Sequence, residues 1–313
     1  MEEVMIDRDD PRLLLIGRCV DCKRDSLERQ GVLFTCASCG RVYPFDENGI
    51  LRAFPQVQIY TPPYVYNTVG YRQWLSAWEE IIGDWIIYKN RFYRWFSMSG
   101  FRKIKGFIKK KLTENDIIVD LGCGHGQLFS LVNPVQGIGL DANLHFLQVL
   151  KKRFPRVLAI HADFFNTPFA TGSLECAVSL HTLEHLYFLA EALEEVVRSL
   201  KPKGYFFFSI PTEGGLGWEL GRRMVTGPFM MRNYKMDIRK IMAVEHINDA
   251  RRVLKFLKFY FLIEKTVYAP FSFLRTLHLN SSISGSARPG QRDWNPYHNK
   301  FQNLKDLKNG PNQ

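Results

Sequence analysis

Five short apolar runs recur between residues 116 and 211 of the chain. They are the segments DIIVDLG, QGIGLD, RVLAIHAD, LECAVSL and GYFFFSIP. The runs are apolar throughout rather than alternating, which is typical of strands buried on both faces of a parallel sheet. Segments with helical periodicity, such as HFLQVLKKRF and LAEALEEVVRSL, separate them. The pattern predicts an α/β fold with a doubly wound, mostly parallel sheet.

Composition divides the rest of the chain into further regions. Residues 12–55 hold two cysteine pairs, and residues 60–112 are aromatic and basic. The α/β pattern fills residues 113–280. Residues 281–313 are polar and rich in Ser, Gly, Asn and Pro, so we expect them to form a disordered tail.

A glycine cluster follows the first apolar run. Asp120 and Leu121 lead into Gly122-Cys-Gly124-His-Gly126. Glycines at a strand-to-helix turn allow a tight bend and close approach of a ligand, although any α/β protein can use them for a tight loop. The spacing differs from the G-x-G-x-x-G of dinucleotide sites, and no P-loop motif is present.

Acids end the next two runs. Asp141 lies 21 residues after Asp120, and Asp163 ends the third run beside Phe164. A carboxylate at the tip of the second strand is placed to accept hydrogen bonds from ribose hydroxyls, and Phe164 could flank an adenine. Glycines and acids in this order therefore predict a nucleoside ligand.

These motifs, together with LKPKGYFFFSIP, resemble those of the class I S-adenosylmethionine-dependent methyltransferases, of the type 11-like kind. The resemblance implies a Rossmann-like sheet of the seven-stranded type and S-adenosylmethionine as cofactor. It implies that Asp141 holds the ribose and Asp163 the adenine amino group. The methionine part would lie against Asp120, Gly122, Gly124 and Gly126, and the other pocket residues implied are Cys123, Ala142, Phe164 and Leu180.

The segment SLHTLEHL contains His181-x-x-Glu184-His185, which matches a zinc-protease pattern. A protease needs this pattern inside a long helix, whereas here the helical pattern begins only around Phe188. The segment instead follows the fourth apolar run, where an α/β sheet binds its ligands. We therefore reject the protease interpretation.

Three interpretations of this loop stay open. His181 could line the cofactor pocket while Glu184 and His185 fix the loop. Alternatively, His181 or His185 is a general base for the acceptor hydroxyl. Thirdly, the loop resembles the E-x-x-E-H loop of ubiquinone-pathway O-methyltransferases, which implies a divalent metal at the acceptor, although His181 replaces the first Glu. His246 could contribute either to the general-base interpretation or to the divalent-metal interpretation.

The cysteine pairs are Cys19-x-x-Cys22 and Cys36-x-x-Cys39. This spacing predicts a structural Zn²⁺ site in a zinc ribbon, while a thioredoxin-like redox site would need only one pair. The segment also resembles the small ribbon found ahead of bacterial methyltransferase domains or as a methyltransferase partner subunit. The ribbon could be a structural clip or could recognise substrate.

Tyr71 to Trp95 carry aromatic residues at steps of three and four, and residues 86–111 hold nine Lys or Arg and no acid. We expect helices that cap the α/β domain; a membrane-surface helix or a nucleic-acid face are the alternatives. Residues 222–258 form a second basic stretch.

The net charge of +11 favours anionic partners. An acidic N-terminus and the lack of a long uncharged apolar run predict a cytoplasmic protein, with peripheral membrane contact as an option. We expect O-methylation of a small-molecule or lipid-linked sugar acceptor. The runner-up is an RNA methyltransferase, and a third hypothesis is a non-enzymatic cofactor-binding scaffold or partner subunit.

Overall fold

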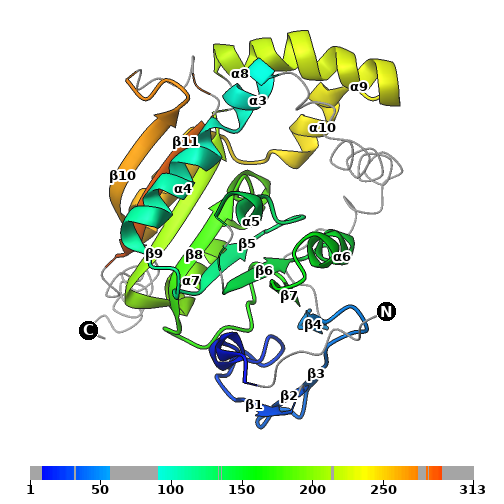
Figure 1. Cartoon of the computed structure of the whole chain (residues 1–313), viewed down its shortest axis with the longest axis vertical. Coiled ribbons are helices and arrows are strands. Elements are labelled where there is room, and N and C mark those ends of the chain that lie inside the picture. The colour runs from blue at the N-terminus through cyan, green and yellow to red at the C-terminus, as the bar shows by residue number, and fades with distance from the viewer. Residues whose placement is uncertain are drawn as a thin grey trace, which may run out of the picture.

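The computed structural model describes residues 9–31, 33–56, 91–132, 134, 136–212, 215–273, 280 and 282–290. An eight-stranded sheet runs through the centre of the molecule, with a small three-stranded sheet beside one of its edges (Figure 1). The expected stripe from Tyr71 to Trp95 falls outside the described residues up to residue 90.

The central sheet has the strand order β10-β11-β9-β8-β5-β6-β7-β4. The strands β4 to β9 pair in parallel, whereas β11 is antiparallel to both of its neighbours. This order confirms the predicted doubly wound, mostly parallel sheet. The strand bounds are β4 Ile50–Arg52, β5 Ile118–Leu121, β6 Gly137–Asp141, β7 Leu158–His161, β8 Leu174–Leu180, β9 Leu200–Pro211, β10 Phe261–Ala269 and β11 Ser282–Pro289.

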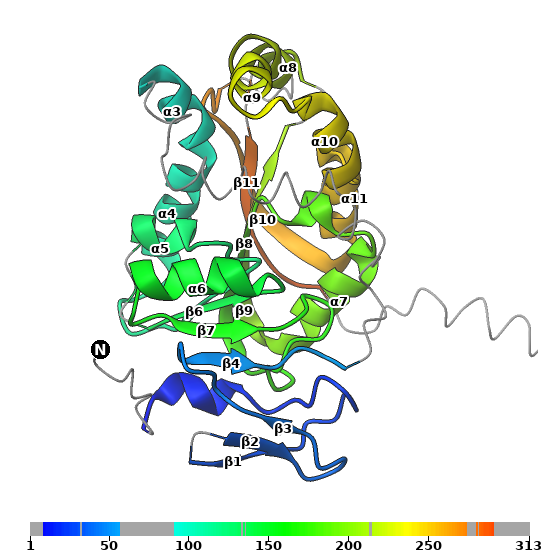
Figure 2. The same cartoon turned by 90° about the vertical axis from the view of Figure 1, so that its right-hand side faces the viewer.

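Helices cover both faces of this sheet (Figure 2). One buried cluster joins the sheet to α4, α5 and α6, and a second joins its other face to α7 and α11. Each helix turns its apolar stripe inward, as Phe101, Ile104 and Ile108 of α4 do. The helix bounds are α3 Arg91–Ser97, α4 Ser99–Lys111, α5 Gln127–Val132, α6 Leu144–Arg153, α7 Leu189–Ser199 and α11 Ala250–Tyr260.

The expectation of a disordered tail is wrong for residues 282–289, which form strand β11 between β9 and β10. Its residues are small because α4 lies directly on it. A Cβ at Gly100 would lie 2.1 Å from the Ser282 hydroxyl, and the Ser284 hydroxyl donates to the Gly100 carbonyl at 3.1 Å. The buried Ser284 hydroxyl also lies 3.1 Å from that of Ser209, so small polar side chains under α4 account for the polar composition of the strand. The last part of the expected tail lies outside the described residues.

The cysteine-rich region is joined to the central sheet. Strands β1 Leu27–Gln30, β2 Leu33–Cys36 and β3 Val42–Tyr43 form the small sheet, preceded by the short helix η1 Pro11–Leu15. The next strand, β4, pairs in parallel with β7 and becomes the eighth strand of the central sheet. Residues of both regions share one buried cluster, so the ribbon and the α/β region have a common core.

A second group of helices lies beyond the carboxyl ends of the strands (Figure 1). It follows β9 and consists of α8 Leu216–Gly221, the π-helical turn η4 Arg222–Thr226, α9 Gly227–Tyr234 and α10 Ile238–Glu245. The short helix η3 Leu183–His185 follows β8 at the same end. Among the described residues, no helix is both long enough and apolar enough to cross a bilayer.

Candidate active site

The glycine loop connects β5 to α5. Gly122, Gly124 and Gly126 have φ values of 75°, 50° and 84°, in the region that favours glycine. A Cβ at Gly122 would lie 2.3 Å from the Thr182 side chain, and one at Gly126 would lie 2.4 Å from Leu150. A Cβ at Gly124 would meet nothing within 4 Å. Two glycines therefore serve packing, and Gly124 borders open space.

Asp141, at the end of β6, holds this loop in place. Its Oδ2 accepts the Gly124 N–H at 2.8 Å, and its Oδ1 accepts the Asn143 N–H at 2.8 Å. Burial raises the pKa of Asp141, and the N–H groups around it act in the opposite direction. The second strand and the glycine loop thus form one hydrogen-bonded edge.

Asp120 lies beside this edge and is 2% exposed. Its Oδ1 has no hydrogen-bond partner among the described residues. Burial raises the pKa of Asp120 well above its usual range, and the neighbouring Asp141 charge adds to the shift. A buried carboxylate without a compensating group is costly, so this position suits a positively charged ligand.

The other residues expected to bind cofactor lie at the ends of adjacent strands. Asp163 follows β7, is buried and accepts the Phe165 N–H through Oδ1 at 3.1 Å. Ala142 is exposed at the end of β6, and Leu180 ends β8. The Phe164 side chain is buried in the core shared with the ribbon. The structure brings the three acids to one edge of the sheet, and their individual roles stay predictions.

His181 directly follows β8 in a left-handed conformation, with φ of 51°. Its N–H donates to the Ser209 carbonyl at 2.8 Å, and its ring lies 4.7 Å from that of Phe101. Burial lowers the pKa of His181 to about 3, with a contribution from His246. The strained backbone places the imidazole, neutral at pH 7, against helix α4.

Two histidines far apart in the sequence meet at the same end of the sheet. The His185 and His246 rings are 4.5 Å apart and nearly perpendicular. Glu184 is 2% exposed, and its Oε1 lies 3.9 Å from Nε2 of His185. Glu184, His185 and His246 each offer a ligand atom within 4.8 Å of the others. We call these three residues the histidine cluster.

The protein fixes the orientation of His185. Its Nδ1 lies 2.9 Å from the Glu245 carbonyl oxygen. A carbonyl can only accept, so Nδ1 carries the proton and Nε2 carries the lone pair. Burial lowers the pKa of His185, and His246 lowers it further. A neutral imidazole with its Nδ1 held by a carbonyl suits a general base or a metal ligand.

Sequence reasoning missed two residues around the histidine cluster. Asn248 donates to the carbonyls of Leu183 and Leu186 at 3.2 and 2.6 Å, and its N–H donates to the Glu184 carbonyl at 3.0 Å. Glu245 lies within 3.8 Å of His185, and burial raises its pKa to about 7. Their proximity to His246 in the segment VEHIN was the only signal available.

The four cysteines lie together in the ribbon. The Sγ atoms of Cys19 and Cys39 are 3.6 Å apart, as are those of Cys22 and Cys36. Four thiolates about 2.3 Å from a zinc ion lie roughly 3.8 Å from one another in a tetrahedron. A disulfide needs about 2.05 Å, and all four cysteines are free thiols. The site fits tetrahedral Zn²⁺.

The two cysteine pairs have matching turns. The Lys23 N–H donates to the Cys19 carbonyl at 2.9 Å, and the Gly40 N–H donates to the Cys36 carbonyl at 2.8 Å. Lys23 and Gly40 have φ values of 59° and 71°. Each pair therefore closes into the same knuckle, which aims its two sulfurs at a common centre.

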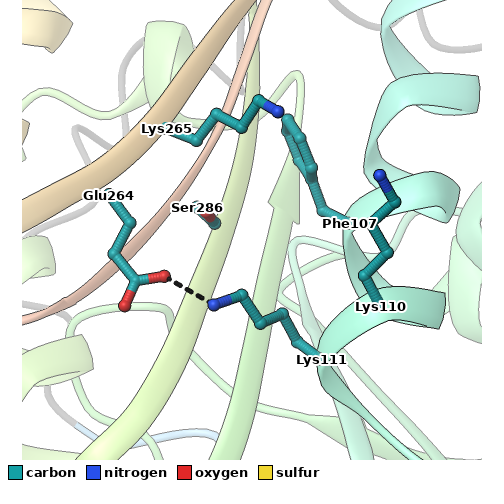
Figure 3. A pocket seen from close by; sticks show the side chains of 6 residues that line it. All are labelled: Phe107, Lys110, Lys111, Glu264, Lys265 and Ser286. Atoms are coloured by element: carbon teal, nitrogen blue, oxygen red, sulfur yellow. Dashed lines mark ion pairs between the residues drawn. The ribbon is translucent and has the colours of Figure 1, made fainter.

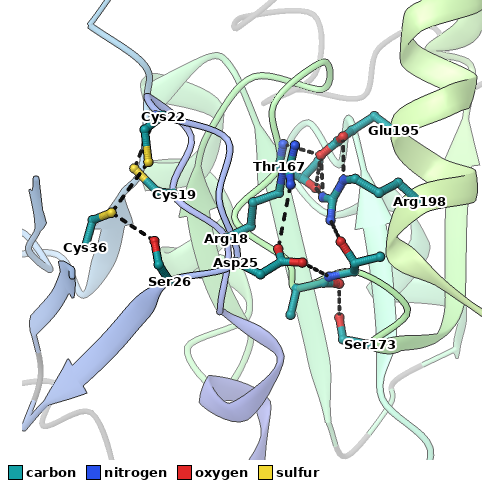
Figure 4. Close-up of polar contacts among 12 residues, drawn as sticks. Arg18, Cys19, Cys22, Asp25, Ser26, Cys36, Thr167, Ser173, Glu195 and Arg198 are labelled. Atoms are coloured by element: carbon teal, nitrogen blue, oxygen red, sulfur yellow. Dashed lines mark hydrogen bonds and ion pairs between the residues drawn. The ribbon is translucent and has the colours of Figure 1, made fainter. Parts of the chain in front are cut away.

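Polar contacts attach the ribbon to the α/β region (Figure 4). The Gly17 and Arg18 N–H groups donate to the Pro168 carbonyl, each at 3.0 Å. Beside them, Asp25, which pairs with Arg18 at 3.7 Å, accepts the Thr171 N–H through Oδ2 at 3.4 Å. Glu195 is buried where it accepts from the hydroxyl of Thr167 and from Arg198. The ribbon thus rests on the loop after β7.

A separate pocket of about 230 Å³ lies between α4 and strands β10 and β11 (Figure 3). Lys111 pairs there with Glu264 at 3.2 Å, and Lys265 lies over the Phe107 ring at 5.9 Å. None of the residues expected in the site lines this pocket.

Comparison with known proteins agrees with this geometry. Residues 119–208 match the family model described as "Methyltransferase domain". An uncharacterised protein of Methanocaldococcus jannaschii is 27% identical over 176 residues, which cover 54% of this chain and 65% of the relative. A probable S-adenosylmethionine-dependent methyltransferase of Mycolicibacterium smegmatis is 30% identical over 117 residues, covering 37% and 45%.

A malonyl-[acyl-carrier protein] O-methyltransferase of a Marinomonas species is 30% identical over 112 residues, covering 34% of this chain and 42% of the relative. The chain thus spans between 42% and 65% of the length of these relatives. The α/β part of the chain thus has a Rossmann-like fold, and its residues 119–208 are similar to the methyltransferase domain family.

Proposed function

We propose that this protein transfers a methyl group from S-adenosylmethionine to a hydroxyl of a small-molecule or lipid-linked sugar acceptor. The observation that carries the proposal is the edge formed by Asp120, Gly124 and Asp141. An open backbone position, a hydrogen-bonded loop and a buried carboxylate meet there.

This edge fits the cofactor chemically. S-adenosylmethionine has a positively charged amino group, and a cation at Asp120 would compensate the buried carboxylate. The exposed part of Asp141 is placed to accept from ribose hydroxyls. When bound, the cofactor supplies an electrophilic methyl group, so the chain needs only to position the donor and acceptor and to remove a proton.

The histidine cluster supplies the acceptor side of the proposal. Nε2 of His185 carries the lone pair of a neutral imidazole, which allows it to accept a hydroxyl proton. The same three residues also suit a divalent cation, which would lower the pKa of a bound hydroxyl. A relative named as an O-methyltransferase supports oxygen as the methylated atom.

The ribbon has a structural role in this proposal. Tetrahedral Zn²⁺ would hold the knuckles together, because so short a segment forms no core of its own. Because the ribbon shares a buried cluster with the α/β region, an ordered ribbon also stabilises the edge strand β4.

The test is transfer of radiolabelled methyl from S-adenosylmethionine into a host extract that is then separated into RNA, protein, organic-soluble and small polar pools. Label in the organic-soluble or small polar pool supports the proposal. Label in RNA would replace it by the runner-up. If no pool is labelled while the cofactor binds, the protein is a scaffold or lacks a partner.

A variant identifies the acceptor-side group. His185→Ala should lower kcat about 10²- to 10⁴-fold with cofactor affinity unchanged. His145→Ala, on the exposed side of α6, is the matched control. Treatment with EDTA followed by Zn²⁺ alone, or by Zn²⁺ with Mg²⁺, tests for a metal at the cluster that Zn²⁺ does not replace. Recovery only with Mg²⁺ indicates a metal at the cluster, and full activity of His185→Ala would exclude both.

A further inference from the structure

An exposed apolar stripe follows the helical segment from α8 through η4 to α9. Leu216, Leu220, Met224 and Met231 are between 48% and 68% exposed. Leu216 and Leu220 lie four residues apart on one face of α8, and Met224 and Met231 follow at steps of four and seven residues, on η4 and α9. Large apolar side chains that gather on one exposed face indicate an interaction surface, whereas single ones do not.

Basic residues flank this stripe. Arg223, Arg232 and Lys240 are exposed and have no ion pair with any described acid. Arg222 pairs with Glu219, and Arg239 pairs with Asp237 at 3.1 Å. The segment from 216 to 240 therefore combines an apolar face with an excess of positive charge.

Two aromatic residues lie at the same end of the molecule. Trp95, on α3, is 44% exposed and packs edge-on against Phe271 with ring centroids 6.0 Å apart. Phe273 is 80% exposed. Both phenylalanines follow β10, whose last residue, Ala269, pairs with Ser282 opposite the end of β9. Figures 1 and 2 show α3 and α8–α9 together at this end.

We propose that this end of the protein docks on an anionic lipid bilayer, with the α8–α9 stripe inserted at the headgroup level. Leucine and methionine gain by transfer to acyl chains, and arginines beside them meet anionic headgroups. Trp95 suits the same interface, because it has an apolar body and a polar edge.

The side-chain types of the stripe favour a bilayer over RNA, whereas the positive charge suits both. A single-stranded nucleic acid would stack its bases on aromatic side chains, whereas the α8–α9 stripe is aliphatic. The docking surface also continues into the site, since α10 packs on α9 and ends immediately before His246. Docking would therefore place the histidine cluster beside the membrane surface.

The test is flotation of the full-length, zinc-loaded protein with vesicles of phosphatidylcholine, or of phosphatidylcholine with about 30% phosphatidylglycerol. The anionic vesicles should bind the protein, and the neutral ones much less. The double variant Leu220→Glu, Met224→Glu should lower the partition coefficient about tenfold or more. Leu262→Glu is the matched control, since Leu262 on β10 is 67% exposed, like Met224.

Vesicle flotation does not measure methyl transfer, so it can overturn the docking proposal independently of the proposed function. No binding to anionic vesicles would exclude a membrane surface, and equal loss in Leu262→Glu would show that the stripe is not involved. Circular dichroism must show that the double variant is folded. If it is not, the charge variant Arg223→Glu, Arg232→Glu should weaken binding, and unchanged binding there would overturn the proposal. If these variants lose binding to RNA and keep binding to vesicles, the surface belongs to an RNA methyltransferase, the runner-up function.

Discussion

The ring of Phe54 stacks on the ring of His161, with centroids 4.7 Å apart and an interplanar angle of 19°. Phe54 follows the ribbon strand β4, and His161 ends β7. The Ala53 N–H donates to the His161 carbonyl at 2.9 Å, and Nε2 of His161 lies 3.0 Å from the Ala142 carbonyl. The ribbon is thus in contact, through one histidine, with the residue that follows Asp141.

We expect Phe54→Ala to weaken S-adenosylmethionine binding by a small factor and to destabilise the protein by about 1–3 kcal/mol, because both the aromatic contact and apolar burial are lost. Calorimetric titration with the cofactor and denaturant unfolding measure the two effects. Phe54→Leu keeps most of the apolar area and is the control. A stability loss with unchanged affinity would show that the ribbon does not influence the ribose end of the site.

Asp141→Ala should weaken cofactor binding by about 10- to 100-fold, because the variant loses the charge-assisted hydrogen bond to the Gly124 N–H and the carboxylate that, in the proposed function, holds the ribose. Equilibrium binding of S-adenosylhomocysteine is the measurement. Lys152→Ala, on helix α6 directly after β6, is the control and should leave the affinity unchanged. Affinity equal to that of the wild type would contradict the placement of the cofactor at this edge.

Cys36→Ser should remove one equivalent of bound zinc and lower the melting temperature, since Cys36 is buried and its sulfur lies 3.6 Å from that of Cys22. Metal analysis and thermal unfolding test this expectation. Cys176→Ser, at a buried cysteine in β8, controls for loss of a core thiol without loss of a ligand. If wild-type protein purified without any zinc has the same melting temperature as zinc-loaded protein, the metal has no structural role.

The two knuckles give a paired prediction on backbone conformation. Lys23 has φ of 59° and Gly40 has φ of 71°. Lys23→Gly should leave stability unchanged or raise it by up to about 1 kcal/mol, because glycine accepts this conformation without strain, whereas Gly40→Val should lower it by more than that. Denaturant unfolding gives the free energy of unfolding of both variants. Equal losses of that free energy in Lys23→Gly and Gly40→Val would contradict the strain argument.

A pH effect on stability follows from His125 in the glycine loop. Burial, and then the Arg153 guanidinium, lower the pKa of His125 to about 4 from 6.5. The unfolded chain therefore binds a proton that the folded one does not between these pH values, so this contribution to stability is present above about pH 6.5 and is lost as the pH falls to about 4.

His125→Gln should accordingly reduce the loss of unfolding free energy over this pH window by about 1–3 kcal/mol. Denaturant unfolding at a series of pH values measures the slope. His145→Gln, at an exposed histidine, should change the slope little. The same slope in His125→Gln as in the wild type would show that the imidazole is not desolvated.

Much of the site could be predicted because local patterns encode it. The glycine loop follows an apolar run, and parallel strands bring Asp120, Asp141 and Asp163 to one edge whatever the details of packing. The cysteine spacing likewise predicted the knuckles. The meeting of His185 with His246 depends on where α10 packs, and neither local periodicity nor composition determines that position.

The sequence by itself determined the parallel core, the turn that bends at the glycines and the two knuckles, because each depends on residues close together in the chain. Only the tertiary structure decided that the polar segment 282–289 is the strand beneath α4, that β4 extends the sheet beside β7, and that Glu184, His185 and His246 form one cluster. Each of these three arrangements depends on contacts between segments that are distant in the sequence. Those segments come together only once the central sheet has formed, so no local pattern encodes them.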